Sequence, residues 1–144
     1  MEMHDIVIEQ EDAVLFDQSL SRFIEDTGVR VALLMGRDGH LLIQQGVSKD
    51  VDVESLCALA VGAFASSEAL AHLSGEESFN SIFHQGIRCN VYIALVGADH
   101  LLLSLFDYHA SAPLVRLQAK VTAEAIVSIL ERATTRTRAS RTNV

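Results

Sequence analysis

Apolar residues recur with helical spacing near both ends of the chain. In the first segment, apolar side chains from Phe16 to Ile24 share one face, and Gly28 supplies a stop. The last segment begins near Ser111, with Pro113 in its first turn, where a missing N–H costs little. Its apolar stripe consists of Leu114, Leu117, Val121, Ala125, Ile129 and Leu130. We expect both stripes to face the protein interior.

Residues 54–73 form a third helical segment, which is apolar around almost its whole circumference. One face carries a stripe that we expect to pack on a sheet: Leu56, Leu59, Ala63 and Leu70. The opposite face is small and apolar, where a helix facing water would be polar: Ala58, Gly62, Ala65 and Ala69. Three residues interrupt this pattern: Glu54, Glu68 and His72. A helix of this kind is expected to be buried on two sides.

Short apolar runs between turn residues predict five strands, at residues 29–35, 40–45, 79–85, 89–96 and 101–106. Tight turns, such as the one at Asp38-Gly39, join neighbouring strands, so the sheet is expected to be antiparallel. The mixed polar and apolar residues of 79–85 suit an edge strand. The predicted fold class is α/β (α+β): a three-layer α/β/α arrangement with a five-stranded antiparallel sheet and the order α-β-β-α-β-β-β-α.

The outer face of the helix at 54–73 has two interpretations. The chain itself could cover this face, for instance with its first ten residues. Alternatively the face binds another molecule, since 144 residues leave little structure for a fourth layer. In that case the neighbouring edge strand 79–85 could pair with its own copy across a two-fold axis.

Composition and charge narrow the class of protein. A chain of 144 residues suits one domain that needs no metal or disulfide. Its formal net charge of −8 argues against a general nucleic-acid binder. We see no basic signal-peptide region and no apolar run long enough for a membrane span, and we expect a cytoplasmic protein. Cys57 and Cys89 lack motif spacing and are predicted to be buried thiols.

Catalytic motifs are missing from the sequence. It contains no phosphate-binding loop, no GxSxG, no HExxH and no CxxC, so no cofactor is expected. Asp107 and His109 have a spacing that could hold a metal, although Asp107 suits a turn acceptor better. Arg37 and Arg88 are candidates for an arginine finger, with an ordinary surface role as the alternative. The remaining histidines show no catalytic pattern, and we expect His40 and His100 to be solvated in turns. His84, on the expected edge strand, suits an ordinary surface position, with a pH-sensitive dimer contact as the alternative.

The order of elements, with Asp38-Gly39 in the first hairpin, resembles the Roadblock/dynein light-chain family, whose fold is profilin-like. Residues 11–132 share this resemblance, which is strongest to the bacterial MglB-type GTPase-activating proteins. It rests on several short segments in a fixed order: residues 52–62, 70–73, 75–76, 83–86, 96–97, 106–107 and 114–117. Glu68 and Ser67 depart from the small or apolar residues expected there.

The resemblance implies a homodimer in which the second helix and third strand of each copy meet and the two sheets become continuous. The implied dimer contacts are Val61, Phe64, Phe79, Ser81 and Phe83. It also implies a small Ras-like GTPase bound over the paired helices, with the GTPase supplying its own catalytic residues. The implied partner contacts are Ala58, Gly62, Ala65, Ala69, Glu68 and His72.

Three functions therefore remain open from the sequence. The first is a GTPase-activating protein in bacterial cell polarity or motility. The second is a Roadblock dimer that acts as a scaffold and holds a GTPase or signalling component without accelerating hydrolysis. The third is a metal enzyme that uses Asp107 and His109. We divide the chain into an N-terminal extension (1–10), the Roadblock domain (11–132) and a flexible basic tail (133–144).

Overall fold

The computed structural model describes residues 6–46 and 49–142. Its order of elements is the predicted one. The elements are α1 (Gln10–Thr27), β1 (Val31–Gly36), β2 (Leu41–Gly46), α2 (Val53–Leu73), β3 (Ser81–His84), β4 (Asn90–Val96), β5 (His100–Phe106) and α3 (Ala112–Thr142). Part of the predicted N-terminal extension, residues 1–5, and residues 47–48 of the connection between β2 and α2 lie outside the described residues.

The five strands form one antiparallel sheet in the order β2-β1-β5-β4-β3. Strands β2 and β3 are its edges, which confirms the edge position expected for β3. Two glycines act as predicted. Gly28 ends α1 with a φ of 82°, and Gly39 adopts a φ of 91° in the β1–β2 turn, a region where other residues are strained.

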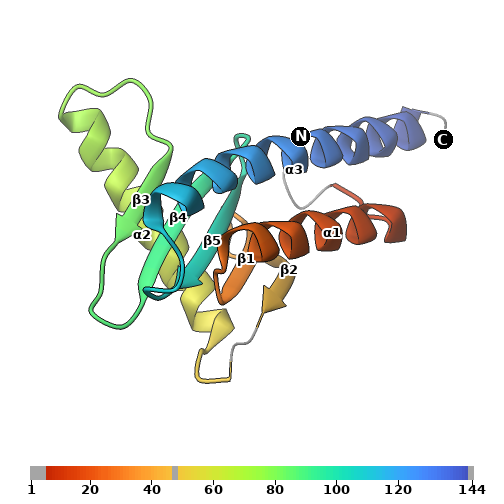
Figure 1. Cartoon of the computed structure of the whole chain (residues 1–144). Helices are drawn as coiled ribbons and strands as arrows, with labels where there is room; N and C mark the ends of the chain where they lie inside the picture. Colours follow the sequence, from red (N-terminus) through yellow and green to blue (C-terminus); the bar gives the residue numbers. More distant parts are fainter. Residues whose placement is uncertain (1–5, 47–48, 143–144) are drawn as a thin grey trace.

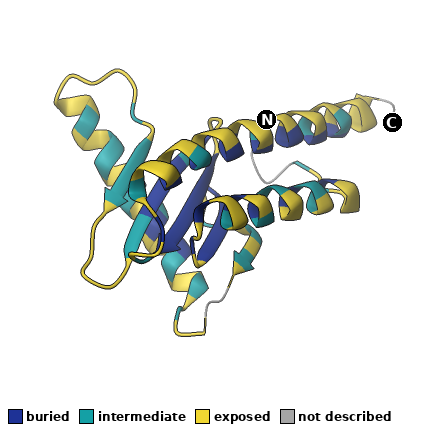
Figure 2. Ribbon diagram, viewed as in Figure 1, coloured by how far each residue is buried: buried dark blue, intermediate teal, exposed yellow. Residues whose placement is uncertain are grey.

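Helices cover both faces of the sheet, which confirms the three-layer arrangement. Helices α1 and α3 lie side by side on one face, and α2 crosses the other (Figure 1). Side chains alternate between the two faces along each central strand. Leu34 and Leu102 point toward α1 and α3, whereas Leu33 and Leu103 point toward α2. The buried residues accordingly lie at the centre of the sheet and on the inner side of each helix (Figure 2).

Helix α3 differs from the prediction in its buried face. Ile129 and Leu130 are buried as expected. Four predicted core positions are instead exposed: Leu114, Leu117, Val121 and Ala125. The buried side of α3 contains Ile126 and several smaller residues. These smaller residues are Val115, Ala119, Thr122, Ala123 and Ala133. The error arose because α3 carries two apolar stripes, and helical spacing alone does not distinguish them.

The expectation of a loose tail after residue 132 was also wrong, because α3 continues to Thr142. Ala133 and Thr137 are 0% and 4% exposed, so this part of the helix is packed. The Val7 N–H donates a hydrogen bond of 3.1 Å to Thr137 Oγ1. Residues near the two ends of the chain are therefore joined, and only residues 143–144 of the predicted tail lie outside the described part.

A buried ion pair holds the same two segments together. The Asp12 side chain is fully buried and forms an ion pair and hydrogen bonds with the Arg136 guanidinium. Arg136 Nε also lies 3.1 Å from Glu9 Oε1, and Arg136 Nη1 lies 3.5 Å from Glu11 Oε1. Asp12 in addition accepts a hydrogen bond of 2.9 Å from the Glu9 N–H and caps α1. The start of α1 is thereby tied to the C-terminal half of α3.

Candidate interaction surface

Helix α2 packs on the sheet through one narrow face. Cys57, Ala60 and Phe64 are buried against it. Leu59 and Leu70, which we expected on this face, are 72% and 69% exposed, so that part of the prediction was wrong. Small residues at 57 and 60 let the helix approach the sheet closely, and the Phe64 ring fills the space beyond them. Asp52 begins the helix by accepting a hydrogen bond of 3.2 Å from the Ser55 N–H.

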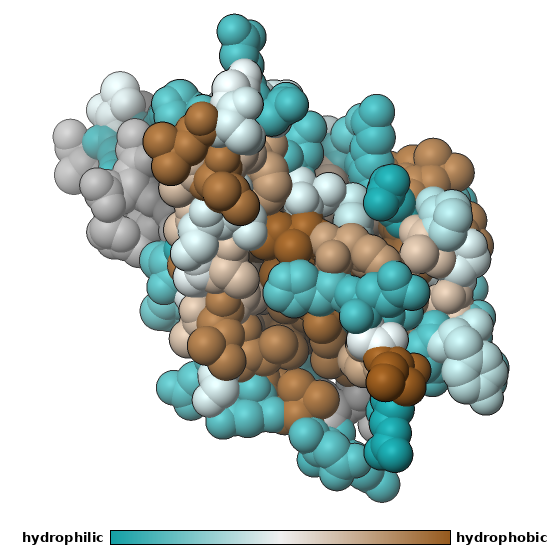
Figure 3. All heavy atoms as spheres, turned by 90° about the vertical axis from the view of Figure 1, so that its left-hand side faces the viewer, coloured by the Kyte–Doolittle hydropathy of each residue, from teal (hydrophilic) through white to brown (hydrophobic). Residues whose placement is uncertain are grey.

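The side of α2 that points away from the sheet is exposed and apolar. The four small residues predicted there are all exposed: Ala58, Gly62, Ala65 and Ala69. They are accompanied by Leu59, Leu70 and Leu73, the last of which is 85% exposed. Figure 3 looks at the side of the molecule where α2 and β3 lie and shows apolar residues gathered there. We call these seven residues the outer face of α2.

The described N-terminal residues do not cover this face. Residues 6–9 lie on the other side of the sheet, where Ile8 packs into the core beneath α1 and α3 and Val7 bonds to α3. The prediction that no segment could span a membrane was wrong for α2, which by length and composition is apolar enough to cross one. One side of α2 nevertheless packs on the sheet, as a helix of this fold does.

Arg37, at the tip of the β1–β2 hairpin, is held against α2. Its Nη2 lies 2.5 Å from Glu68 Oε1, and its guanidinium lies over the Phe64 ring at 5.3 Å. Nη1 donates to the Ala98 carbonyl at 3.3 Å. Arg37 is therefore a structural link between the hairpin and α2, whereas Arg88 is exposed in the β3–β4 loop. Glu68 stands at the border of the outer face, half-buried and with its charge paired.

Strand β3 lies beside α2 and pairs only with β4 among the described strands. Its other edge therefore has backbone groups that a further strand could bind. Phe79, Ser81 and Phe83 are partly exposed around this edge, and so is Val61 on α2. Phe64 is different: it is 1% exposed and packs on Phe79 at 5.1 Å, so it has no surface left for a direct contact with another molecule.

A hollow of about 380 Å³ separates α2 from the segment that leads into β3. Its lining includes Ala65, Ala69, Glu68 and His72 from the predicted partner contacts, together with Phe79. His72 is exposed in the last turn of α2. The structure thus brings most of the residues singled out from the sequence to one continuous side of the molecule.

Asp107 and His109 form a turn rather than a metal site. Asp107 Oδ1 lies 2.9 Å from both the backbone N and the ring Nδ1 of His109. The backbone and ring hydrogen bonds from His109 hold the pKa of Asp107 below its ordinary value. No cluster of three metal-binding side chains occurs among residues 6–46 and 49–142.

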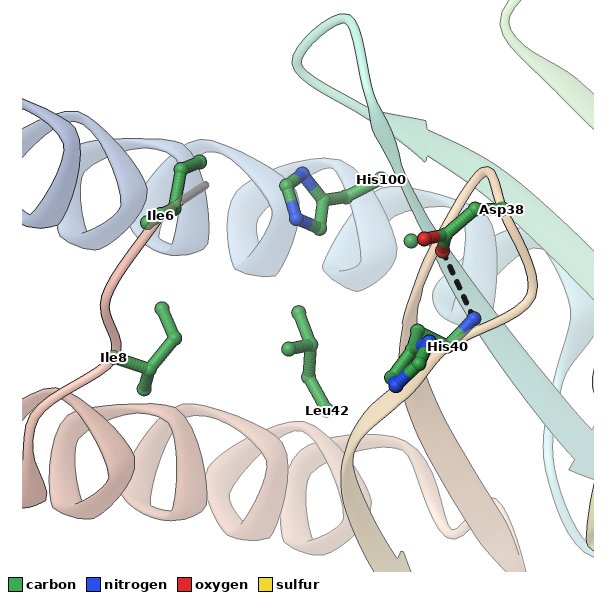
Figure 4. A pocket seen from close by; sticks show the side chains of 7 residues that line it. Ile6, Ile8, Asp38, His40, Leu42 and His100 are labelled. Carbon is green, nitrogen blue, oxygen red and sulfur yellow. Dashed lines mark hydrogen bonds between the residues drawn. The ribbon is translucent and has the colours of Figure 1, made fainter. Parts of the chain in front are cut away.

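His100 was expected to be solvated, but it is 4% exposed. It borders a cavity of about 200 Å³ between the segment that precedes α1 and the first hairpin, together with Ile6, Ile8 and Leu42 (Figure 4). Burial lowers the pKa of His100, while the charges of Asp99 and Asp38 act in the opposite direction. The prediction failed because β5 begins at His100, one residue before the predicted strand. His100 is therefore the first residue of β5 and not part of the turn.

The two cysteines have different surroundings. Cys57 is buried under α2, and burial raises the pKa of its thiol. Cys89 is exposed in the β3–β4 loop, so the prediction of two buried thiols was wrong for this residue. His40 and His84 are exposed as expected.

Comparison with known families decides the membership of this chain. The Roadblock/LC7 domain matches residues 15–106. The chain belongs to the Roadblock/LC7 family. Comparison with curated protein sequences found no match.

Among solved structures, this Roadblock chain is similar to those of MglB. The gliding protein MglB from Thermus thermophilus is 32% identical, with a TM-score of 0.82 over 88% of this chain and 96% of that one. Myxococcus xanthus MglB is 30% identical, with a TM-score of 0.80 over 88% and 96%. A structure described as MglB with tetrameric arrangement is 32% identical, with a TM-score of 0.84 over 89% and 96%. Acanthamoeba castellanii profilin II, at 12% identity and a TM-score of 0.57 over 80% and 95%, shares the fold alone.

Sequence reasoning identified the small residues of the outer face but missed its large ones. Helical spacing predicts Leu59 and Leu70 on the side facing the sheet, yet both are exposed, and so is Leu73 in the last turn of α2. A usable signal was present in the pattern, because Cys57, Ala60 and Phe64 also follow helical spacing. The hydrophobicity of leucine favours a buried position, which led to the wrong choice of face. Close packing of a helix on a sheet instead favours small residues on the buried side.

Proposed function

We propose that this Roadblock protein is a homodimer that regulates a small Ras-like GTPase in bacterial cell polarity or motility. The supporting observation is the combination of an exposed apolar outer face on α2 with an open β3 edge next to it. Three exposed leucines beside four small residues make a surface that is stabilised by contact with another protein. Pairing β3 with its copy would satisfy the free backbone groups and bring two α2 helices together.

The partner GTPase would bind over the paired α2 helices and hydrolyse GTP faster. Small side chains at Ala58, Gly62, Ala65 and Ala69 allow another backbone to approach closely. Arg37 is unsuited to act as an arginine finger, because its guanidinium is paired with Glu68 and packed on Phe64. The protein would therefore act by repositioning catalytic groups of the GTPase, without an active site or cofactor of its own.

A turnover assay tests this proposal. The candidate GTPase is one encoded beside this chain, loaded with GTP, and its phosphate release is measured with and without the protein. We expect faster release with the wild-type protein and no binding by Ala65→Arg, because bulk and charge are added to a close-packed surface. Ala65 is exposed in the single chain, so the variant should fold normally.

The matched control is Gln18→Arg, which adds the same side chain to the exposed side of α1, across the sheet from α2. It should leave both binding and turnover unchanged. Unimpaired binding by Ala65→Arg would mean that the contact lies elsewhere. Tight binding without faster phosphate release would favour the alternative function, a scaffold that holds the GTPase without activating it.

A further inference from the structure

A second groove lies on the opposite side of the sheet from the outer face of α2. It runs between α3 and the edge formed by β4 and β3 and has a volume of about 480 Å³. Tyr92 and Ala94 of β4 form part of its floor, next to Ser81 of β3. One wall is α3, which contributes Arg116 and Lys120 one turn apart. The proposed GTPase contacts do not include this wall.

Positive charge is concentrated on the helix that forms this wall. Helix α3 contains six of the eleven Lys and Arg residues: Arg116, Lys120, Arg132, Arg136, Arg138 and Arg141. With Glu124 and Glu131 its balance is 6 − 2 = +4, against 5 − 17 = −12 for the other residues. Arg116 and Lys120 are exposed, and Glu124 follows at the far end of the groove. The charged residues that line the groove are Arg116, Lys120 and Glu124, a balance of 2 − 1 = +1 on a protein whose formal net charge is −8.

Dimerisation through β3 would close this groove on its second side. Helix α3 packs over β4, so two α3 helices would be separated by three strand spacings, roughly 14 Å. Helices in direct contact have axes about 8–10 Å apart, so this larger separation would leave a gap between the two α3 helices. The gap would be about as wide as one extended chain. Phe83, which faces the α3 side of the sheet, would add an apolar floor from each copy. Arg116 and Lys120 of both copies would line the two walls.

We propose that this trough binds an extended acidic segment of a further partner protein. The inference rests on the proposed homodimer but concerns a different surface from the GTPase contact. Glutamate or aspartate side chains would pair with Arg116 and Lys120, and alternate apolar side chains would lie on Tyr92 and Phe83. Since the trough and the paired α2 helices lie on opposite faces of the sheet, both ligands can bind at once.

The test measures binding of a defined probe to the full-length dimer. The probe is a fluorescein-labelled peptide in which glutamate alternates with valine or serine, and a peptide with lysine in place of glutamate is the control. We expect saturable anisotropy with the acidic peptide, weakening as salt is raised. Arg116→Glu combined with Lys120→Glu should weaken binding at least tenfold. A matched pair outside the groove, Arg22→Glu with Arg138→Glu, should bind like the wild type.

Ala65→Arg separates this proposal from the GTPase proposal, because it should lose the GTPase and keep the peptide. Absence of saturable binding by an intact dimer overturns the trough proposal alone. If both charge-reversal variants bind the acidic peptide equally weakly, the trough proposal is also overturned. The peptide would then be attracted by the net charge of the protein and not by the groove. Conversion of the dimer to monomer by the peptide would place the peptide on the β3 edge instead. Adsorption to phosphatidylserine vesicles without peptide binding would identify a membrane surface and also contradict the proposal.

Discussion

Asp12 shows how one buried carboxylate can join two distant parts of the chain. Burial alone would raise its pKa, but hydrogen bonds from Arg136 and the Glu9 N–H, with the nearby guanidinium charge, hold the pKa below its ordinary value. Folding therefore favours the ionised form. This contribution to stability is present above the unfolded pKa and is lost as pH falls through the lower, folded pKa.

Removing the cation should destabilise the protein. Arg136→Ala leaves the buried Asp12 carboxylate without its charge partner, and we expect the Tm at neutral pH to fall by roughly 5–10 °C. Calorimetry measures the change. Arg138→Ala, an exposed residue half a turn away, is the control and should have little effect. An equal, small effect from both variants would show that the ion pair contributes nothing.

Because His100 is buried, we expect the stability of the protein to depend on pH near neutrality. Burial lowers its pKa in the folded state below the ordinary value of 6.5. As pH falls below about 6.5, the unfolded chain takes up a proton that the folded chain resists, so stability decreases through that window. His100→Gln should remove this decrease, measured as urea midpoints across the pH series. The exposed His40→Gln should retain it, and retention by both variants would assign the decrease to other groups.

At the scale of elements, the sequence predicted which segments are helices and strands and which side of α1 is buried, but not the buried sides of α2 and α3. Turn residues such as Asp38-Gly39 and Gly28 marked boundaries well, because positive φ restricts the residue type. In α2 and α3, apolar side chains occupy more than one stripe. The choice between stripes depends on how closely each helix approaches its neighbours, which is a tertiary property. The small residues Cys57, Ala60 and Ala119 are buried there, and Leu59 and Leu117 are left outside.

The C-terminal part of α3 gives a prediction at the same scale. Its arginines and threonines read as a solvated tail in the sequence, since the partners of Arg136 and Thr137 lie more than 120 residues away. A chain that stops at Arg132 loses both contacts and the buried Ala133. We expect its Tm to fall further than that of Arg136→Ala, measured by circular dichroism. An unchanged Tm would show that this part of α3 does not support the fold.

On the scale of the whole molecule, two surfaces lie on opposite faces of one sheet. The outer face of α2 is apolar, and the groove beside α3 carries Arg116 and Lys120 on its helical wall. The sequence predicted the first because small residues at Ala58, Gly62, Ala65 and Ala69 are unusual toward water. It could not predict the second, because Arg116 and Lys120 come to line one groove only once α3 lies over β4. Glu68 could not be understood from sequence either, since its partner Arg37 is 31 residues away.

The central claim is that the β3 edge and the neighbouring side of α2, at Val61, are covered by a second copy of this chain. Sedimentation equilibrium of the purified protein over a wide concentration range tests it most directly. We predict a mass of twice 15.7 kDa, and a shift toward 15.7 kDa when Val61, at the border of α2 and partly exposed, is changed to glutamate. A wild-type mass of 15.7 kDa at every concentration would contradict the account.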